Sequence, residues 1–444
     1  MKAQVEGRAE TRTIAVAGVE SGWGSSGKLG AVLSALRHRG GDRLRFVGLA
    51  SGLGRPVLAD HPVERWFDLP ETRSEQELRR IVGAQRVQAA LVMRDGPLAN
   101  ALRACGVPVV FVDSLPFLRT DGDRSDLPLD AEVYCAQRCV ELPPEGARVL
   151  ADVRRLRWVD AVIADGGATR RAEPTPHPRR AVLSLGGLRA PRLTDWASYP
   201  QLVLPAALEA LTASGVTEVH IAGNLPAWLA AQLVDSCAHP AVTTVGALPH
   251  EDFVRRLADC DVLLTSPGLT TLLEAGLLGT PTLCLPPQNL SQIFNGRFHS
   301  QALDSDLRVR WPTEVFDEDE ALALRAQGEG KALELIYGGI ARAADLNRHR
   351  TTAAVRDGLG QLLGRLAGGV EEVGAAVDAD VLPPPGPGRT PPDFPATDRP
   401  AADRPATDWT ALTTTVGTAG ASQVADALVQ LLAGLPREAT APAH

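Results

Sequence analysis

Long apolar runs are missing from the sequence. No uninterrupted apolar stretch approaches the roughly 20 residues that a helix needs to span a bilayer, and no basic start followed by an apolar run marks a signal peptide. Basic charge is not in excess either, because 45 Lys and Arg stand against 53 Asp and Glu, for a formal net charge of −8. Such a chain gains no counterion-release affinity for nucleic acid from its overall charge. We therefore expect a cytoplasmic protein that neither spans a membrane nor binds nucleic acid.

Cysteine is scarce and scattered, with six residues in 444. Only Cys135 and Cys139 lie close together, and neither a second cysteine pair nor an H-x3-H partner accompanies them. This pattern favours reduced, buried thiols over a zinc site or a disulfide framework.

The chain is long enough for two domains, and two series of short apolar runs divide it. The first series places expected strands at Thr13–Gly18, Leu44–Leu49, Ala89–Val92, Val107–Val112 and Val159–Ala164. The second places them at Ala181–Leu185, Glu218–Ala222, Val242–Val245, Val262–Thr265 and Thr282–Leu285. Helical spacing of apolar residues fills most of the intervals. Strands that alternate with helices predict a parallel sheet covered on both faces in each half.

Changes in composition set the expected boundaries. We expect Rossmann-like domains over residues 12–165 and 181–366, joined by a Pro-rich linker over residues 166–180. Residues 376–407 are rich in Pro and Asp, a composition that forms no core and predicts disorder. Residues 408–436 predict a terminal helix, which either docks on the body or stands alone. Ligands of such sheets bind at the carboxyl ends of the strands, which predicts a site in a cleft.

The strongest chemical signal in the second half is a turn between a strand and a helix. The apolar strand ends at Ser266-Pro267-Gly268, and a helix begins near Leu269. The free amides and the dipole of the first helical turn suit a diphosphate, and a glycine at position 268 lets the backbone approach closely. Glu274 lies about one and a half turns further along the helix, where a carboxylate can accept both hydroxyls of a ribose.

A pair of amide side chains follows the next predicted strand. Gln292 and Asn295 are spaced i, i+3, so they share one face of a helix. Each amide both donates and accepts hydrogen bonds, which suits sugar hydroxyls.

This constellation resembles the donor-site motif of GT-B glycosyltransferases, especially that of the lipid II-forming N-acetylglucosaminyltransferase of peptidoglycan synthesis. The similarity covers mainly residues 180–300 and includes the Gly268-to-Glu274 spacing, Gly279-Thr280-Pro281 and Gln292-x-x-Asn295. It implies a GT-B fold, with two Rossmann-like domains facing across a cleft, and a UDP-sugar as co-substrate without a further cofactor. The resemblance implies that Glu274 holds the ribose and that Gln292 and Asn295 hold the donor sugar. The implied contacts to the diphosphate and the base come from Gly186, Gly187, Gly246, Ser266, Gly268, Leu269 and Thr270.

A glycine-rich segment follows the first predicted strand. Residues Gly22–Lys28 fit the phosphate-loop pattern G-x4-G-K, but Leu29 replaces the Ser or Thr that binds Mg²⁺. A phosphate-loop NTPase therefore stays an alternative. The other interpretation is the first glycine-rich loop of a GT-B enzyme, which lines the cleft between acceptor and donor. It predicts an acceptor site that includes Gly24, Ser25, Ser26 and Arg94.

Many GT-B enzymes carry a histidine in this loop as general base, and this chain has none. Transfer with inversion needs a base near the acceptor and positive or dipolar stabilisation of the leaving diphosphate. Asp113 follows an apolar run, so we predict it as the base ahead of Glu20, and we predict that Lys28 meets a phosphate or another anionic group. No D-x-D tripeptide follows an apolar strand, so we expect no metal. His250 and His299 are expected at helix caps or on the surface.

The opening segment GVESGWGSSGKLGAVLSALR is similar to the start of cytosylglucuronate synthases and their relatives in actinomycete nucleoside-antibiotic pathways. Those enzymes join glucuronic acid from UDP-glucuronate to N1 of cytosine. The resemblance implies metal-independent, inverting transfer to a small nucleobase-like acceptor in bacterial secondary metabolism. A UDP-sugar hydrolase or 2-epimerase on the same fold and a non-catalytic binding subunit remain as alternatives.

Overall fold

The computed structural model describes residues 11–18, 23–39, 43–49, 54–69, 74–164, 169–170, 177–188, 195–223, 225, 228–232, 242–367 and 407–435. Most of the expected linker, residues 376–406 of the Pro-rich segment and Glu20 lie outside these residues.

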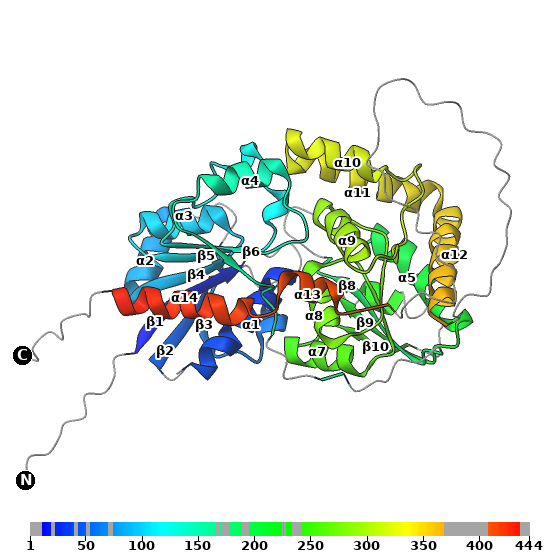
Figure 1. The fold of residues 1–444 in the computed structure, drawn as a ribbon, viewed down its shortest axis with the longest axis horizontal. Helices are drawn as coiled ribbons and strands as arrows, with labels where there is room; N and C mark the ends of the chain where they lie inside the picture. The colour runs from blue at the N-terminus through cyan, green and yellow to red at the C-terminus, as the bar shows by residue number, and fades with distance from the viewer. Residues whose placement is uncertain are drawn as a thin grey trace, which may run out of the picture.

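The first domain is built on a seven-stranded parallel sheet in the order β3-β2-β1-β4-β5-β6-β7 (Figure 1). Its strands are β1 (Arg12–Gly18), β2 (Leu44–Leu49), β3 (Val63–Phe67), β4 (Val87–Met93), β5 (Val109–Asp113), β6 (Val133–Gln137) and β7 (Leu156–Val159). One face packs on α1 (Gly24–His38) and on the C-terminal helix α14 (Gly420–Gly434). The other face packs on α2 (Glu75–Gln85), α3 (Gly96–Ala104) and α4 (Pro144–Ala151). Short 3₁₀ turns are η2 (Arg55–Leu58), η3 (Pro116–Leu118) and η4 (Asp121–Asp123).

The second domain is built on a five-stranded parallel sheet in the order β10-β9-β8-β11-β12. Its strands are β8 (Arg180–Gly186), β9 (Glu218–Gly223), β10 (Val242–Gly246), β11 (Val262–Thr265) and β12 (Thr282–Cys284). One face packs on α5 (Ser198–Ala213), α9 (Leu290–Ala302), α11 (Glu329–Leu346) and α12 (Arg348–Ala367). The other face packs on α7 (His250–Asp259) and α8 (Leu269–Leu278). The short helix α10 (Glu318–Leu324) and the turn η5 (Arg325–Gln327) precede α11.

The first sheet has strands that the sequence pattern did not predict. Both edge strands are among them, β3 and β7, and each exposes polar side chains such as Glu64 and Arg157. The predicted strand Val159–Ala164 is wrong over most of its length, because β7 ends at Val159. Ala161, Val162 and Ile163 are fully buried, but they pack on the C-terminal helices rather than in the sheet. An apolar run signals burial, and the burial here comes from a helix.

The C-terminal segment contacts both domains (Figure 1). Helix α13 (Ala411–Val416) packs against α8 and α9 of the second domain, and α14 packs against α1 and the first sheet. Gly417 lies between these helices with φ +73, in the left-handed region that favours glycine. Two backbone bonds fix this junction to the chain after β7, from Ala161 N to Gly417 O (3.2 Å) and from Gly420 N to Ala161 O (3.1 Å). The terminal helix therefore docks on the body, a point that the sequence left open.

We expect α14 to stabilise the first domain. Leu428 is fully buried on this helix, so Leu428→Ala should lower the free energy of unfolding by about 2–5 kcal/mol, because it leaves a cavity. The neighbouring Val429 is 40% exposed, and Val429→Ala should change it by only about 0.5 kcal/mol. Chemical denaturation of the two variants measures the contrast. Equal stability of both variants would show that α14 is not packed on the sheet in solution.

The two Rossmann-like domains face each other across a cavity lined by residues of both. This confirms the GT-B fold expected from the sequence. Among the helices in the described residues, none combines the length and the apolar character needed to cross a membrane.

Candidate functional site

The cavity between the domains has a volume of about 530 Å³, within the usual range for small-ligand sites. Its first-domain wall comes from the start of α1 and from the segments that follow β4 and β5. Its second-domain wall comes from the segments that follow β8, β11 and β12, together with α9 and α11. The carboxyl ends of parallel strands from both sheets thus meet at one space, the position where such sheets hold ligands.

The start of α8 presents unshared backbone amides to the cavity. Gly268 is its N-cap, and no side chain caps the first turn. Ser266, Gly268, Leu269 and Thr270, which the sequence analysis expected at a turn suited to a diphosphate, all line the cavity. An uncapped helix N-terminus that faces a cavity favours an anion through its amides and its dipole.

Buried hydrogen bonds hold this turn in place. The hydroxyl of Tyr199 on α5 donates to the carbonyl of Pro286 (2.8 Å) and lies 3.1 Å from Ser266 Oγ. Ser266 Oγ in turn donates to the carbonyl of Leu185 at 3.3 Å. The turn is therefore tied to the ends of β8 and β12, which keeps its amides at a fixed place beside the cavity.

Glu274 lines the cavity from within α8, and His250 is its direct partner. Glu274 Oε1 and His250 Nε2 lie 2.5 Å apart, and the two side chains are only 4% and 7% exposed. Burial by itself lowers the pKa of His250, but the charge and the hydrogen bond of Glu274 outweigh it and raise that pKa above its usual value. The expectation of a surface or capping position for His250 is therefore wrong. The sequence feature that could have indicated this position is that His250 begins α7, shortly after the end of strand β10.

Lys28 reaches across the domain boundary. Its ammonium donates to Thr270 Oγ1 at the start of α8, and Thr270 Oγ1 also donates to the carbonyl of Gly24 at 3.2 Å. Burial lowers the pKa of Lys28 to about 7, against the opposing charge of Glu274 and with a further contribution from Arg94. The ammonium of Lys28 and the positive end of the α8 dipole repel each other. A bound anion would interact favourably with both.

Helix α9 presents Gln292 and Asn295 to the cavity together, as their spacing predicted. Gln292 Oε1 accepts a hydrogen bond from the backbone amide of Gln288 (2.9 Å), and Asn295 Nδ2 donates to the carbonyl of Pro267 (2.9 Å). Asn295 Oδ1 is buried and has no hydrogen-bond partner among the described residues. It is therefore available to a ligand hydroxyl.

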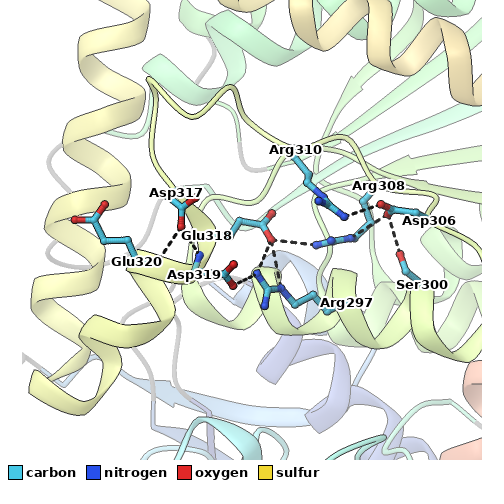
Figure 2. A network of polar contacts seen from close by, with 9 residues as sticks. All are labelled: Arg297, Ser300, Asp306, Arg308, Arg310, Asp317, Glu318, Asp319 and Glu320. Atoms are coloured by element: carbon cyan, nitrogen blue, oxygen red, sulfur yellow. Dashed lines mark hydrogen bonds and ion pairs between the residues drawn. The ribbon is translucent and has the colours of Figure 1, made fainter. Parts of the chain in front are cut away.

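An ion-pair network fixes the far half of α9 (Figure 2). Arg297 on α9 pairs with Glu318 (3.2 Å) and Asp319 (2.7 Å) at the start of α10. Arg308 joins the same Glu318 (3.2 Å) to Asp306 (3.3 Å). Two D-x-D tripeptides, Asp304–Asp306 and Asp317–Asp319, therefore contribute to this network, and Asp317 also caps α10. The network positions the helix that carries the amide pair.

The glycines predicted near the donor divide into two groups. Gly186 and Gly187 line the cavity, and Gly186 has φ +64, a conformation that L side chains rarely adopt. Gly246, predicted to face the nucleotide base, ends β10 but is not among the lining residues, whereas Leu248 and His250 beyond it are.

The glycine-rich segment at the first-domain wall is helical from Gly24 onward. Gly24, Ser25 and Lys28 line the cavity, whereas Ser26 is buried and does not. A side chain at position 24 would lie 3.2 Å from Thr270 Oγ1, so glycine here permits close contact between the domains. Leu29 is buried in the core of the first domain, so the residue that would bind Mg²⁺ in a phosphate loop serves packing here.

Asp113 ends β5 but does not line the cavity. Its carboxylate is fully buried and accepts hydrogen bonds from Arg119 Nε (2.8 Å), Arg119 Nη2 (2.9 Å), the Tyr134 hydroxyl (2.8 Å) and the Leu115 amide (3.3 Å). Burial alone raises the pKa of Asp113, but Arg119, with help from Tyr134 and Arg94, holds it below its usual value. The geometry does not support the predicted role of Asp113 as general base. A carboxylate with a lowered pKa is a weak base, and Arg119 lies between this one and the cavity.

Sequence reasoning missed several lining residues that depend on tertiary packing. They are Trp23, Arg119, Gln288, Glu329 and Tyr337.

His299 was expected at a cap or on the surface but is buried, and burial lowers its pKa to about 4. Within the described residues, no group of three or more His, Cys, Asp or Glu side chains is arranged to hold a metal ion.

No protein-family model and no curated protein matches the chain. Solved structures do resemble it. MurG from Acinetobacter baumannii is 16% identical over 79% of this chain and 99% of its own, with a TM-score of 0.41. The S. aureus MnaA-UDP co-structure is 12% identical over 80% and 95%, with a TM-score of 0.46. A UDP-glucosyltransferase from Polygonum tinctorium capable of glucosylating indoxyl is 14% identical over 80% and 99%, with a TM-score of 0.46. At these identities the likeness concerns the fold alone.

Proposed function

We propose that this protein is a glycosyltransferase that moves a sugar from a UDP-sugar to a small acceptor in the cavity between its domains. One observation carries the proposal: an uncapped helix start, a buried carboxylate in the same helix and an amide pair on the next helix line one cavity. These three features supply, in order, amides for a diphosphate, an acceptor for ribose hydroxyls and hydrogen bonds for a sugar.

The roles of the donor residues follow from their positions. The amides of Leu269 and Thr270, next to Gly268 whose own amide donates to the carbonyl of Ser266, hold the diphosphate, and Glu274 accepts hydrogen bonds from the ribose. Gln292 and Asn295 hold the transferred sugar. The ammonium of Lys28 and the dipole of α8 stabilise the negative charge that develops on the leaving UDP.

The finer proposal concerns the reaction itself. It is a metal-independent, inverting transfer from UDP-glucuronate to cytosine or a related nucleobase in bacterial secondary metabolism, supported by the resemblance of residues 18–37 to cytosylglucuronate synthases. Glu20 is the proposed base, since Asp113 is committed to Arg119. The base accepts the acceptor's proton as the new bond to the anomeric carbon forms and UDP leaves.

A donor screen followed by a turnover assay tests the proposal. The protein is heated with a panel of nucleotides and nucleotide-sugars, and a bound ligand raises Tm by mass action. We expect UDP and at least one UDP-sugar to raise Tm, and ATP to leave it unchanged. UDP release from that donor should then require an acceptor such as cytosine. Consumption of the donor without any acceptor would indicate a hydrolase or an epimerase instead, and stabilisation by Mg-ATP alone would indicate an NTPase.

Lys28 gives the donor site an expected pH dependence. With a pKa of about 7, the side chain is charged below neutral pH, and a bound diphosphate stabilises the charged form. Binding of UDP above pH 7 must therefore take up a proton, so the affinity should fall as pH rises, by up to about tenfold per pH unit. Calorimetry of UDP binding between pH 6.5 and 9 measures this slope.

Two substitutions isolate the contribution of Lys28. Lys28→Met should bind UDP more weakly and lose most of the slope, whereas Lys28→Arg keeps its charge throughout this range and should bind with a flat profile. An unchanged slope in Lys28→Met would assign the pH dependence to another group, such as His250.

A further inference from the structure

Glu274 has two basic neighbours in the cavity but bonds only one of them. Its Oε1 lies 2.5 Å from Nε2 of His250, the first residue of α7. Lys28 also feels the charge of this carboxylate, yet it donates to Thr270 at the start of α8. No ion pair joins Lys28 to Glu274 among the described residues. The acid and the ammonium are therefore kept apart, although opposite charges attract strongly in buried surroundings.

The imidazole of His250 is fixed between the two domains. It belongs to α7 of the second domain and lies against α1 of the first, because a β-carbon at Gly27 would be 3.8 Å from its Cδ2 and 3.9 Å from its Nε2. Only 7% of the side chain is exposed, so the ring has little room to turn away from Glu274. Its Nε2 is therefore held at one place beside the carboxylate.

Charges on every element packed around His250 act on its protonation. Burial lowers its pKa, Glu274 of α8 and Glu251 of its own helix raise it, and Lys28 of α1 lowers it, with a raised pKa as the net result. His61, which follows η2, is buried, and burial together with the charge of His250 lowers its pKa to about 4, so it stays neutral. The protonated form of His250 is thus favoured, and in that form Nε2 donates to Glu274.

Lys28 faces a different set of charges. Burial lowers its pKa, Glu274 raises it, and Arg94 lowers it. Arg94, which the sequence analysis expected in the acceptor site, lines the cavity on the first-domain wall. A buried ammonium with another cation near it would gain from bonding the carboxylate directly. The position of Lys28 on Thr270 therefore depends on a different partner for Glu274.

The bond to His250 leaves part of the Glu274 carboxylate open to a ligand. Each carboxylate oxygen offers two lone pairs, and Glu274 accepts a hydrogen bond only on Oε1 among the described residues. Because Glu274 lines the cavity, Oε2 remains for hydroxyl groups. The last torsion of a glutamate has no sharp preference, so a donor that holds one oxygen also fixes the direction of the other.

We propose that His250 is a positioning residue: its hydrogen bond to Oε1 directs the Glu274 carboxylate to the ribose and away from Lys28, and so makes the site select a ribonucleotide over its 2′-deoxy analogue. The inference rests on the proposed function, because Glu274 is the ribose acceptor only there. It gives His250 no contact with the ligand. It leaves Lys28 on Thr270, next to the amides that hold the diphosphate.

Two substitutions that differ by one methylene test this role. In His250→Gln the amide reaches about as far as Nε2 of the imidazole and keeps a donor on Oε1, whereas the amide of His250→Asn is too short. Calorimetry gives the Kd of UDP and of 2′-deoxy-UDP for each protein. The wild type should bind UDP about 10- to 100-fold more tightly, because the missing hydroxyl leaves a buried carboxylate without a partner. His250→Asn should lose most of this preference, and His250→Gln should keep it.

The matched control is His61→Asn. His61 is buried near His250, but it does not line the cavity, and neither ring nitrogen has a hydrogen-bond partner among the described residues. This variant should keep the preference of the wild type for UDP.

A double variant tests whether His250 acts through Glu274. In Glu274→Ala the preference for UDP should already be lost, so adding His250→Asn should change neither Kd further. A further loss of UDP affinity in the double variant would show direct contact between His250 and the ligand, and it would contradict the inference.

The remaining outcomes separate the inference from the proposed function. Protein that binds no UDP overturns both. The inference alone fails if the wild type binds UDP and 2′-deoxy-UDP equally, if His250→Asn keeps the preference, or if His250→Gln loses it as fully as His250→Asn does. Tm measurements show whether the variants fold. If His250→Asn does not, His250→Ser, which is also too short to reach Oε1, takes its place.

Discussion

Replacing Asp113 with alanine is expected to lower the free energy of unfolding by about 3–5 kcal/mol, because it leaves the guanidinium of Arg119 buried without its counter-ion. Asp113 is fully buried, and the side chain of Arg119 is only 13% exposed. The Tyr134 hydroxyl loses its acceptor at the same time. Chemical denaturation followed by circular dichroism measures the loss.

Two further variants serve as controls for the loss of stability in Asp113→Ala. Asp121→Ala removes a carboxylate whose partners, Arg124 and Arg148, lie on the surface, and it should leave Tm unchanged, since exposed ion pairs contribute little. Combining Asp113→Ala with Arg119→Met should recover part of the loss, because no unpaired charge remains. A stable Asp113→Asn protein that binds UDP normally but has lost turnover would instead restore the role of Asp113 as the base.

Replacing Glu274 with alanine should weaken UDP binding by about 1–3 kcal/mol, the usual cost of losing a charged hydrogen-bond partner, which is about 5- to 150-fold in Kd. The carboxylate is almost fully buried, so water does not readily replace it. The change also removes the partner of His250 and the negative charge that keeps Lys28 protonated. Calorimetry of the double variant Glu274→Ala with Lys28→Met, compared with Lys28→Met alone, separates the lost ribose contact from the altered lysine.

The matched control for Glu274 is another glutamate of the same cavity. Glu329 lines the second-domain wall at the start of α11, and the proposal gives it no contact with UDP. Glu329→Ala should therefore bind UDP as the wild type does. Equal affinities of Glu274→Ala and the wild type would remove residue 274 from the donor site.

The second-domain wall of the cavity was predictable because its parts are close together in the sequence. Strand β11, the turn at Gly268, the position of Glu274 in α8 and the amide pair of α9 follow one another within residues 262–295. Local rules for helix termini and side-chain spacing are then enough to place each group on one side of the sheet.

The other half depends on contacts that the sequence does not display. Lys28 and Thr270 are 242 residues apart, and they meet only because the two domains pack at the start of α1. Asp113 was correctly placed at a strand end, but its partner Arg119 could not be read from the pattern. His250 looked like an ordinary helix start until α7 and α8 packed side by side. Charges acquire their roles from such neighbours, which the position of a residue at a strand end does not reveal.

A crystal structure with UDP bound tests the central claim most directly. The account predicts that the diphosphate accepts hydrogen bonds from the amides at the start of α8, within reach of Lys28, and that the ribose hydroxyls donate to Glu274. UDP bound outside this cavity, or bound inside it with its ribose away from Glu274, would contradict the account.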